Sequence, residues 1–116
     1  MTKQVPATTV VISLADARKL GPPPAGALSH VLFSRGDFEV EWYAPESTDS
    51  QEPHDRDEIY VVASGSAVFF DGDGRTPVGP GAFIFVPAWR EHRFEEISPG
   101  FGTWVAFFGP VGGHPT

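Results

Sequence analysis

The chain has 116 residues, a formal net charge of −7 and no cysteine, so it has room for one domain with a modest core and for neither disulfides nor thiolate metal sites. The acidic balance, with only eight scattered Lys and Arg residues, argues against a nucleic-acid partner. No apolar run is long enough to span a bilayer and residues 1–10 do not have the pattern of a signal peptide, so we expect a cytoplasmic protein without a membrane partner.

The predicted elements begin with a short strand at residues 8–13 and one short helix at residues 14–20, which Gly21 and the prolines at 22–24 end. Runs rich in Val, Ile and aromatic residues then alternate with glycine and proline turns, which is typical of short strands joined tightly. Eight further strands are predicted at residues 28–34, 37–44, 58–63, 67–71, 75–78, 82–86, 92–96 and 102–108. This succession indicates an all-β sandwich or barrel.

Within the strand at residues 37–44, Phe38, Val40 and Trp42 alternate with polar positions. Side chains two residues apart share one face of a strand. We therefore expect these three residues to form part of the core or the wall of a cavity, which makes Trp42 a candidate pocket residue.

The segment at residues 52–60 carries the candidate chemistry. Glu52 and His54 share one face by the period of two, as do Glu58 and Tyr60, and a turn near residues 55–57 would bring both pairs to one mouth. A His and a Glu at this spacing suit a divalent Mn, Fe, Ni or Zn ion. Tyr60 would point inward, either as a packed core residue with a bonded hydroxyl or as a group that contacts substrate and transfers a proton.

A second segment supplies a third candidate ligand. The strand at residues 82–86 ends at Pro87, a short loop follows, and His92 starts the next strand. Trp89 in this loop is either a lid over the mouth or a packed aromatic residue. Arg56, near the same mouth, either holds an anionic substrate or pairs with a surface carboxylate.

These two segments resemble the two motifs of the cupin superfamily. The first motif, G-x5-H-x-H-x3,4-E-x6-G, is matched at His54, Glu58 and Gly65, and the second, G-x5-P-x-G-x2-H-x3-N, at Gly81, Pro87 and His92. The resemblance covers about residues 37–108. It implies a single-domain cupin with a jelly-roll barrel (a double-stranded β-helix), in which residues 1–36 pack on the barrel, residues 37–108 form its core and residues 109–116 form a loose tail.

The chain departs from both motifs. Glu52 replaces the first His and Glu46 the leading Gly, while Trp89 takes the place of the middle Gly and Glu96 that of the last Asn. If Glu52 binds metal, two His and two carboxylates neutralise the ion and weaken its Lewis acidity. If Glu52 points away, the remaining three ligands are similar to the open face of non-heme iron oxygenases. The third alternative is a barrel without metal.

The resemblance implies a divalent-metal cupin that acts on a small organic molecule and pairs as a homodimer. A dioxygenase would bind substrate and oxygen side by side on Fe(II). An isomerase or lyase would polarise a carbonyl or enol, with a carboxylate such as Glu52 moving the proton. The alternatives are a non-catalytic module that binds a small ligand, favoured by the loss of the first His, and a purely structural metal site.

Overall fold

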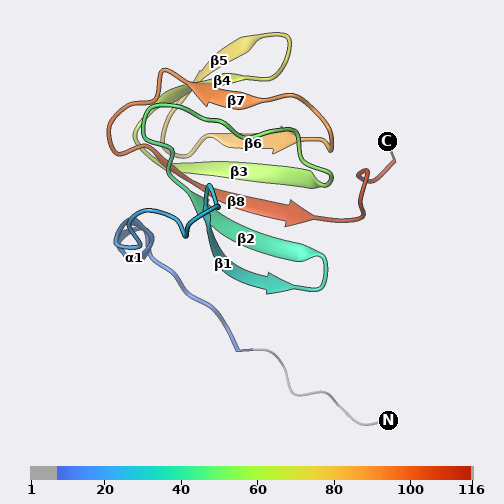
Figure 1. Ribbon diagram of the computed structural model, residues 1–116, viewed down its shortest axis with the longest axis horizontal. Helices are drawn as coiled ribbons and strands as arrows, with labels where there is room; N and C mark the ends of the chain where they lie inside the picture. The colour runs from blue at the N-terminus through green and yellow to red at the C-terminus, as the bar shows by residue number, and fades with distance from the viewer. Residues whose placement is uncertain (1–7, 116) are drawn as a thin grey trace.

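The computed structural model describes residues 8–115 as one short helix and eight strands in two sheets (Figure 1). The larger sheet has the order β1-β2-β8-β3-β6 and the smaller one the order β5-β4-β7, and neighbouring strands in both sheets are antiparallel. The elements are α1 (Leu14–Arg18), β1 (His30–Arg35), β2 (Phe38–Tyr43), β3 (Asp57–Ser64), β4 (Ala67–Phe70), β5 (Arg75–Val78), β6 (Phe83–Val86), β7 (Arg93–Glu95) and β8 (Gly102–Phe108).

The prediction of a strand at residues 8–13 is wrong, because these residues form no helix or strand. The Ser13 hydroxyl instead accepts a hydrogen bond from the Asp16 backbone N–H at 3.0 Å, and the Asp16 carboxylate accepts one from the Ser13 N–H at 3.2 Å. This capping box starts α1. Val10 and Val11 are 51% and 84% exposed, so the apolar pattern that suggested a strand has no sheet to join.

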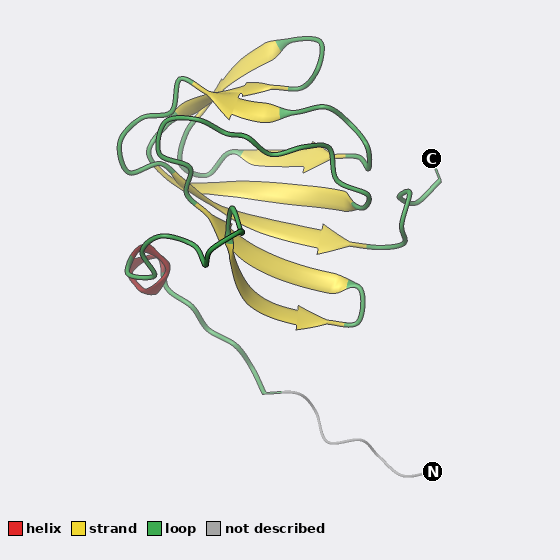
Figure 2. Ribbon diagram, in the orientation of Figure 1, coloured by secondary structure: helices red, strands yellow, loops and turns green. Residues whose placement is uncertain are grey.

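The two sheets face each other across an aromatic core, in a jelly-roll arrangement (Figure 2). This agrees with the expected jelly-roll fold, but the barrel is not closed among residues 8–115, since no strand pairing links the two sheets. A cavity of about 520 Å³ lies between the edge strands β5 and β6, and Pro77 on β5 has no N–H with which to pair. The fully buried side chains between the sheets include Tyr60, Val62 and Phe94.

The register of the larger sheet decides which side chains enter the interior. Glu41 on β2 pairs with Val105 on β8, and Val105 pairs with Tyr60 on β3. Because side chains alternate along a strand, this row faces the core. Trp42 has the opposite parity and packs its ring 4.9 Å from that of Trp104. Phe38, Val40 and Trp42 therefore lie on the face of β2 that points away from this row. Phe38 is 39% exposed, whereas Trp42 is 4% exposed and lines a cavity, as expected.

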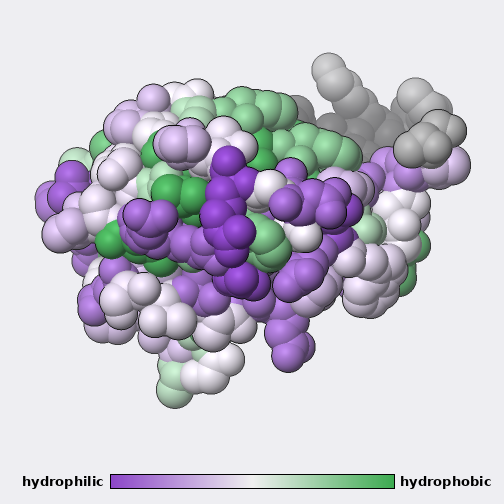
Figure 3. Space-filling model, turned by 90° about the horizontal axis from the view of Figure 1, so that it is seen from above, coloured by the Kyte–Doolittle hydropathy of each residue, from purple (hydrophilic) through white to green (hydrophobic). Residues whose placement is uncertain are grey.

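The outer side of the smaller sheet is charged. Arg75 and Arg93 both pair with Glu95, at 2.8 and 2.9 Å, and both guanidinium groups lie over the Phe70 ring. Figure 3 views the molecule from above and shows a mainly hydrophilic surface with smaller apolar patches. Within residues 8–115, the helix is too short to cross a membrane.

The tail beyond β8 is not loose over its described part. The Gly112 N–H donates to the Asp55 carbonyl at 2.6 Å, and the His114 N–H donates to the Asp57 carboxylate at 3.2 Å. Asp57 also accepts a hydrogen bond from the Ala88 N–H at 2.9 Å. This carboxylate therefore ties the tail and the loop after β6 to the start of β3, beside the mouth of the fold.

Candidate metal centre

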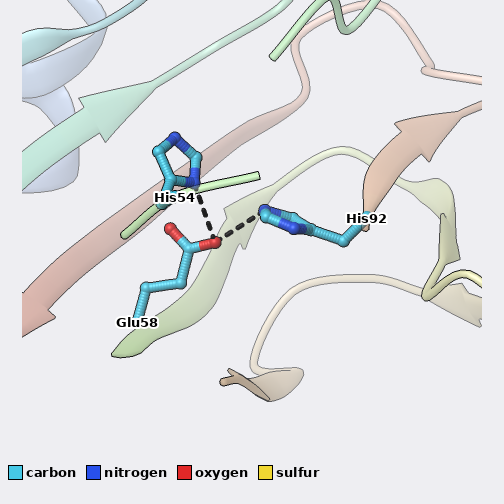
Figure 4. Close-up of side chains that lie close together, drawn as sticks. All are labelled: His54, Glu58 and His92. Atoms are coloured by element: carbon cyan, nitrogen blue, oxygen red, sulfur yellow. Dashed lines mark hydrogen bonds and ion pairs between the residues drawn. The ribbon is translucent and has the colours of Figure 1, made fainter. Parts of the chain in front are cut away.

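Two histidines and one glutamate converge at one end of the core. Glu58 lies on β3, His54 in the loop before β3, and His92 directly before β7. One donor atom from each lies within 4.8 Å of the other two. Figure 4 shows the Glu58 carboxylate between the two imidazole rings. The structure thus brings together three of the predicted ligands from both motifs, and their role in binding metal remains a prediction.

The backbone around the two histidines holds their rings in place. The Trp89 N–H donates to the His54 carbonyl at 2.7 Å, which joins the two loops that carry the rings. His54 also packs edge-on against Phe107, with centroids 4.9 Å apart. The Nδ1 atom of His92 lies 2.8 Å from the Arg90 carbonyl. Because a carbonyl only accepts, Nδ1 carries the hydrogen and Nε2 is directed toward Glu58.

Glu58 is the centre of the cluster and is 1% exposed. Its Oε1 atom lies 2.6 Å from His92 Nε2 and 3.3 Å from His54 Nδ1, while Oε2 has no hydrogen-bond partner within residues 8–115. In neutral His92 the Nε2 atom has a lone pair, so two acceptors would face each other at 2.6 Å. A cation between them, either a proton or a metal ion, relieves this repulsion.

The charges of this pair shift both pKa values. Burial disfavours the charged form of Glu58, but hydrogen bonds from His54 and His92 outweigh it and lower the pKa of Glu58 overall. Burial likewise opposes the charged form of His92, yet the hydrogen bond to Glu58 raises its pKa. Both shifts favour an ion pair between the Glu58 carboxylate and a protonated His92, whose Nε2 lies 2.6 Å from Glu58 Oε1.

Tyr60 adjoins this cluster. Its hydroxyl lies 3.1 Å from His92 Nε2, 3.3 Å from Glu58 Oε1 and 2.9 Å from the side-chain oxygen of Gln51. Burial and the nearby Glu58 carboxylate raise the pKa of Tyr60 well above its ordinary value, so the hydroxyl stays protonated and available as a donor. The expected inward position of Tyr60 is confirmed, since the residue is 1% exposed.

Glu52 is not part of the cluster. Its side chain is exposed, and the group of three that can hold a metal does not include it. The neighbouring Gln51 faces the interior instead, and Asp49 fixes it by accepting from both its side-chain and backbone N–H groups. Residues 47–56 form no strand, so the period of two that placed Glu52 beside His54 does not apply there.

A small cavity of about 40 Å³ adjoins the cluster between β2, β3 and β8. Sequence reasoning missed its acidic residue, Glu41, although this residue alternates with Tyr43 on a predicted strand. Burial and a hydrogen bond with Glu39 raise the pKa of Glu41 to about 7. The lining consists of Leu28, Ser29, Glu41, Tyr43, Gln51, His54, Tyr60, Val105 and Phe107.

The other predicted pocket residues lie outside this lining. Trp42 lines a separate cavity beside α1, and Trp89 is 60% exposed. The backbone of Trp89 has φ 67°, the left-handed conformation that suits the glycine of the second motif. Arg56 donates to the Asp37 carbonyl at 2.8 Å and lies over the Phe107 ring.

Comparison with known proteins agrees with this geometry. A profile described as a cupin domain matches residues 33–108. An uncharacterised protein of Streptomyces coelicolor is 42% identical over 64 residues, which are 55% of this chain and 61% of that protein.

Two solved structures are also similar. A protein of unknown function from Rhizobium leguminosarum bv. viciae 3841 matches with a TM-score of 0.70 and 17% identity, over 90% of this chain and 100% of the other. A proposed mannose-6-phosphate isomerase from Ralstonia eutropha JMP134 matches with a TM-score of 0.60 and 25% identity, over 77% and 92%. The two motifs, the two facing sheets and the matched profile together show that this chain belongs to the cupin family.

Proposed function

We propose that this protein binds one divalent first-row transition-metal ion through His54, Glu58 and His92 and is an enzyme acting on a small organic molecule. The observation that carries the proposal is the convergence of two imidazoles on a buried carboxylate, one of whose oxygens has no hydrogen-bond partner in the described part of the chain. A donor set of two imidazoles and one carboxylate fits Fe, Mn, Ni or Zn. Such an ion acts as a Lewis acid on a bound oxygen atom.

The reaction class that the site supports best is an isomerisation or a lyase reaction. The protonated Tyr60 hydroxyl lies beside two candidate ligands, where it can donate a hydrogen bond to a substrate oxygen or supply a proton. The resemblance to a proposed isomerase at 25% identity supports the same class. In the structure the single hydroxyl hydrogen is donated to the Gln51 side-chain oxygen at 2.9 Å, so donation to a substrate requires the hydroxyl to turn away from Gln51.

Two other functions are supported by particular observations. Three protein ligands leave coordination positions free for substrate and oxygen, as an Fe(II) dioxygenase requires. The replacement of the first motif His by the exposed Glu52 favours a non-catalytic module that binds a small ligand. Oxygen consumption by Fe(II)-loaded protein with catechols, diketones or thiols identifies the first. Ligand binding without turnover identifies the second.

Metal binding is tested with protein stripped by a chelator and then titrated with Mn(II), Fe(II), Ni(II) or Zn(II) in a calorimeter. A ligand at 100 times its Kd stabilises the native state by about 2.7 kcal/mol, so thermal unfolding gives a second readout. We expect the wild type to bind one ion and His92→Ala to lose binding. The matched control is His30→Ala, because the His30 ring lies outside the cluster and forms a hydrogen bond with the Gly21 carbonyl. Equal binding by His92→Ala would contradict the proposal.

We also infer a homodimer, which the outer face of the larger sheet supports. Phe83 and Phe85 on β6 are 65% and 52% exposed, and they lie opposite the outward residues Val61 and Ile59 of β3. Contiguous apolar surface of this kind marks protein contacts. Light scattering should give the mass of two chains for the wild type and of one chain for Phe85→Glu. A monomeric wild type would refute the inference.

A further inference from the structure

Glu41 is the acidic side chain that faces the candidate metal centre from across the cavity. It lies in the same interior row as Tyr60, with Val105 between them. Neighbouring strands are about 4.8 Å apart, so the two backbones are separated by about 10 Å. Both residues line the cavity of about 40 Å³ that also contains His54 and Gln51. The space between Glu41 and the cluster is therefore suited to a few substrate atoms.

The surroundings of Glu41 favour a carboxyl group that exchanges a proton. The Ser29 hydroxyl donates to its Oε1 atom, and Glu39 on the same strand face shares a hydrogen bond with it. None of the nine residues that line the cavity is Lys or Arg, so in the metal-free protein only the Ser29 hydrogen bond and His54 favour the ionised form of Glu41. Burial and Glu39 bring its pKa to about 7, near the value that suits proton transfer at neutral pH.

We propose, on the basis of the function proposed above, that Glu41 is the catalytic residue that accepts and returns a proton of the substrate, in place of the exposed Glu52. The ionised carboxylate takes the proton from an O–H or an activated C–H of the substrate, and the bonding electron pair stays on the substrate. Glu41 gives the proton back to the same molecule or to its leaving group, so no external acid or oxidant is consumed. The absence of Lys and Arg from the lining indicates a neutral, polar substrate rather than a phosphorylated one.

The test uses acetohydroxamic acid, a small neutral probe that binds metals as its anion and so gives up a proton. Calorimetric titrations of Mn(II)-loaded protein at pH 7.5, in buffers of different ionisation enthalpy, count the protons released to solvent. If Glu41 takes up the proton, the wild type releases fewer protons than Glu41→Gln, by about half a proton or more per site. The matched control is Glu91→Gln, the same change at a side chain that is 63% exposed, which should behave like the wild type.

Mn(II) binding is measured by spectroscopy before the probe is added, which distinguishes a failure of the proposed metal site from a failure of the proposed role of Glu41. A wild type that binds no Mn(II) refutes the proposed metal function. Equal proton release by the wild type and Glu41→Gln, with Mn(II) bound in both, overturns the role of Glu41. A change in proton release in Glu52→Gln but not in Glu41→Gln overturns it in favour of Glu52. Mn(II)-loaded wild type that binds no probe also overturns it, because the cavity would then not admit a ligand beside the metal.

Discussion

Replacing Glu41 with glutamine should stabilise the protein at pH 8 and leave its stability nearly unchanged at pH 4. Glutamine is close in shape to the neutral acid: its oxygen can accept from the Ser29 hydroxyl, as Oε1 does, and its amide can donate to Glu39. The substitution therefore removes the buried negative charge and keeps the packing. The cost of that charge to the folded state depends on pH, and so does the expected benefit of the variant.

The magnitude follows from the pKa of Glu41, which rises from 4.5 to about 7 on folding. Because the folded pKa is the higher one, the neutral acid is favoured in the fold. The stability that it contributes is fully present below pH 4.5 and is lost as pH rises through about 7. A shift of this size corresponds to at most about 3.4 kcal/mol. The carboxyl is only partly buried, so solvent screening reduces the expected gain to about 1–2 kcal/mol.

The assay is urea unfolding of metal-free wild type and Glu41→Gln at intervals between pH 4 and pH 8. We expect the difference in unfolding free energy to grow between pH 4.5 and 7 and to level off above that range. Glu91→Gln, at an exposed position, reports the general effect of removing one negative charge. A difference that is independent of pH, or one that favours the wild type at pH 8, would refute the reasoning about Glu41.

Three further predictions concern the backbone and the metal ligands. Trp89→Gly should be more stable than Trp89→Ala by about 1 kcal/mol in urea unfolding, because both remove the ring and only glycine relieves φ 67°; a more stable alanine variant would contradict this. Gly65→Ala should lower the unfolding free energy by about 2–4 kcal/mol, since its Cβ would lie 2.6 Å from the Phe101 backbone. The control Gly74→Ala, whose Cβ would have nothing within 4 Å, should change it by less than about 0.5 kcal/mol. Because the raised pKa of His92 lets a proton compete with metal, calorimetry should show Mn(II) affinity falling by about tenfold or more from pH 8 to pH 6, and a constant affinity would count against His92 as a ligand.

The sequence alone was sufficient to predict the strands from β1 to β8 and to identify the family. Alternating apolar residues and glycine turns are local signals, so the predicted ranges 75–78 and 102–108 coincide with β5 and β8. The spacing of the two motifs is also local, and it correctly singled out His54, Glu58 and His92 as residues that come together. The departure at Trp89 was visible as well, although its left-handed backbone was not.

The inner surface of the cavity depended on contacts between distant parts of the chain. Gln51 faces inward instead of Glu52 because Asp49 holds it, and no periodicity applies in that irregular segment. The Glu41 side chain points into the interior because of the register in which β2 pairs with β8, more than 60 residues further along the chain. Register fixes which face of a strand is buried, and it arises from pairing between strands rather than from the strand itself. Local sequence therefore determined where the strands and ligands lie along the chain, and tertiary pairing decided which acidic side chain faces the candidate metal centre.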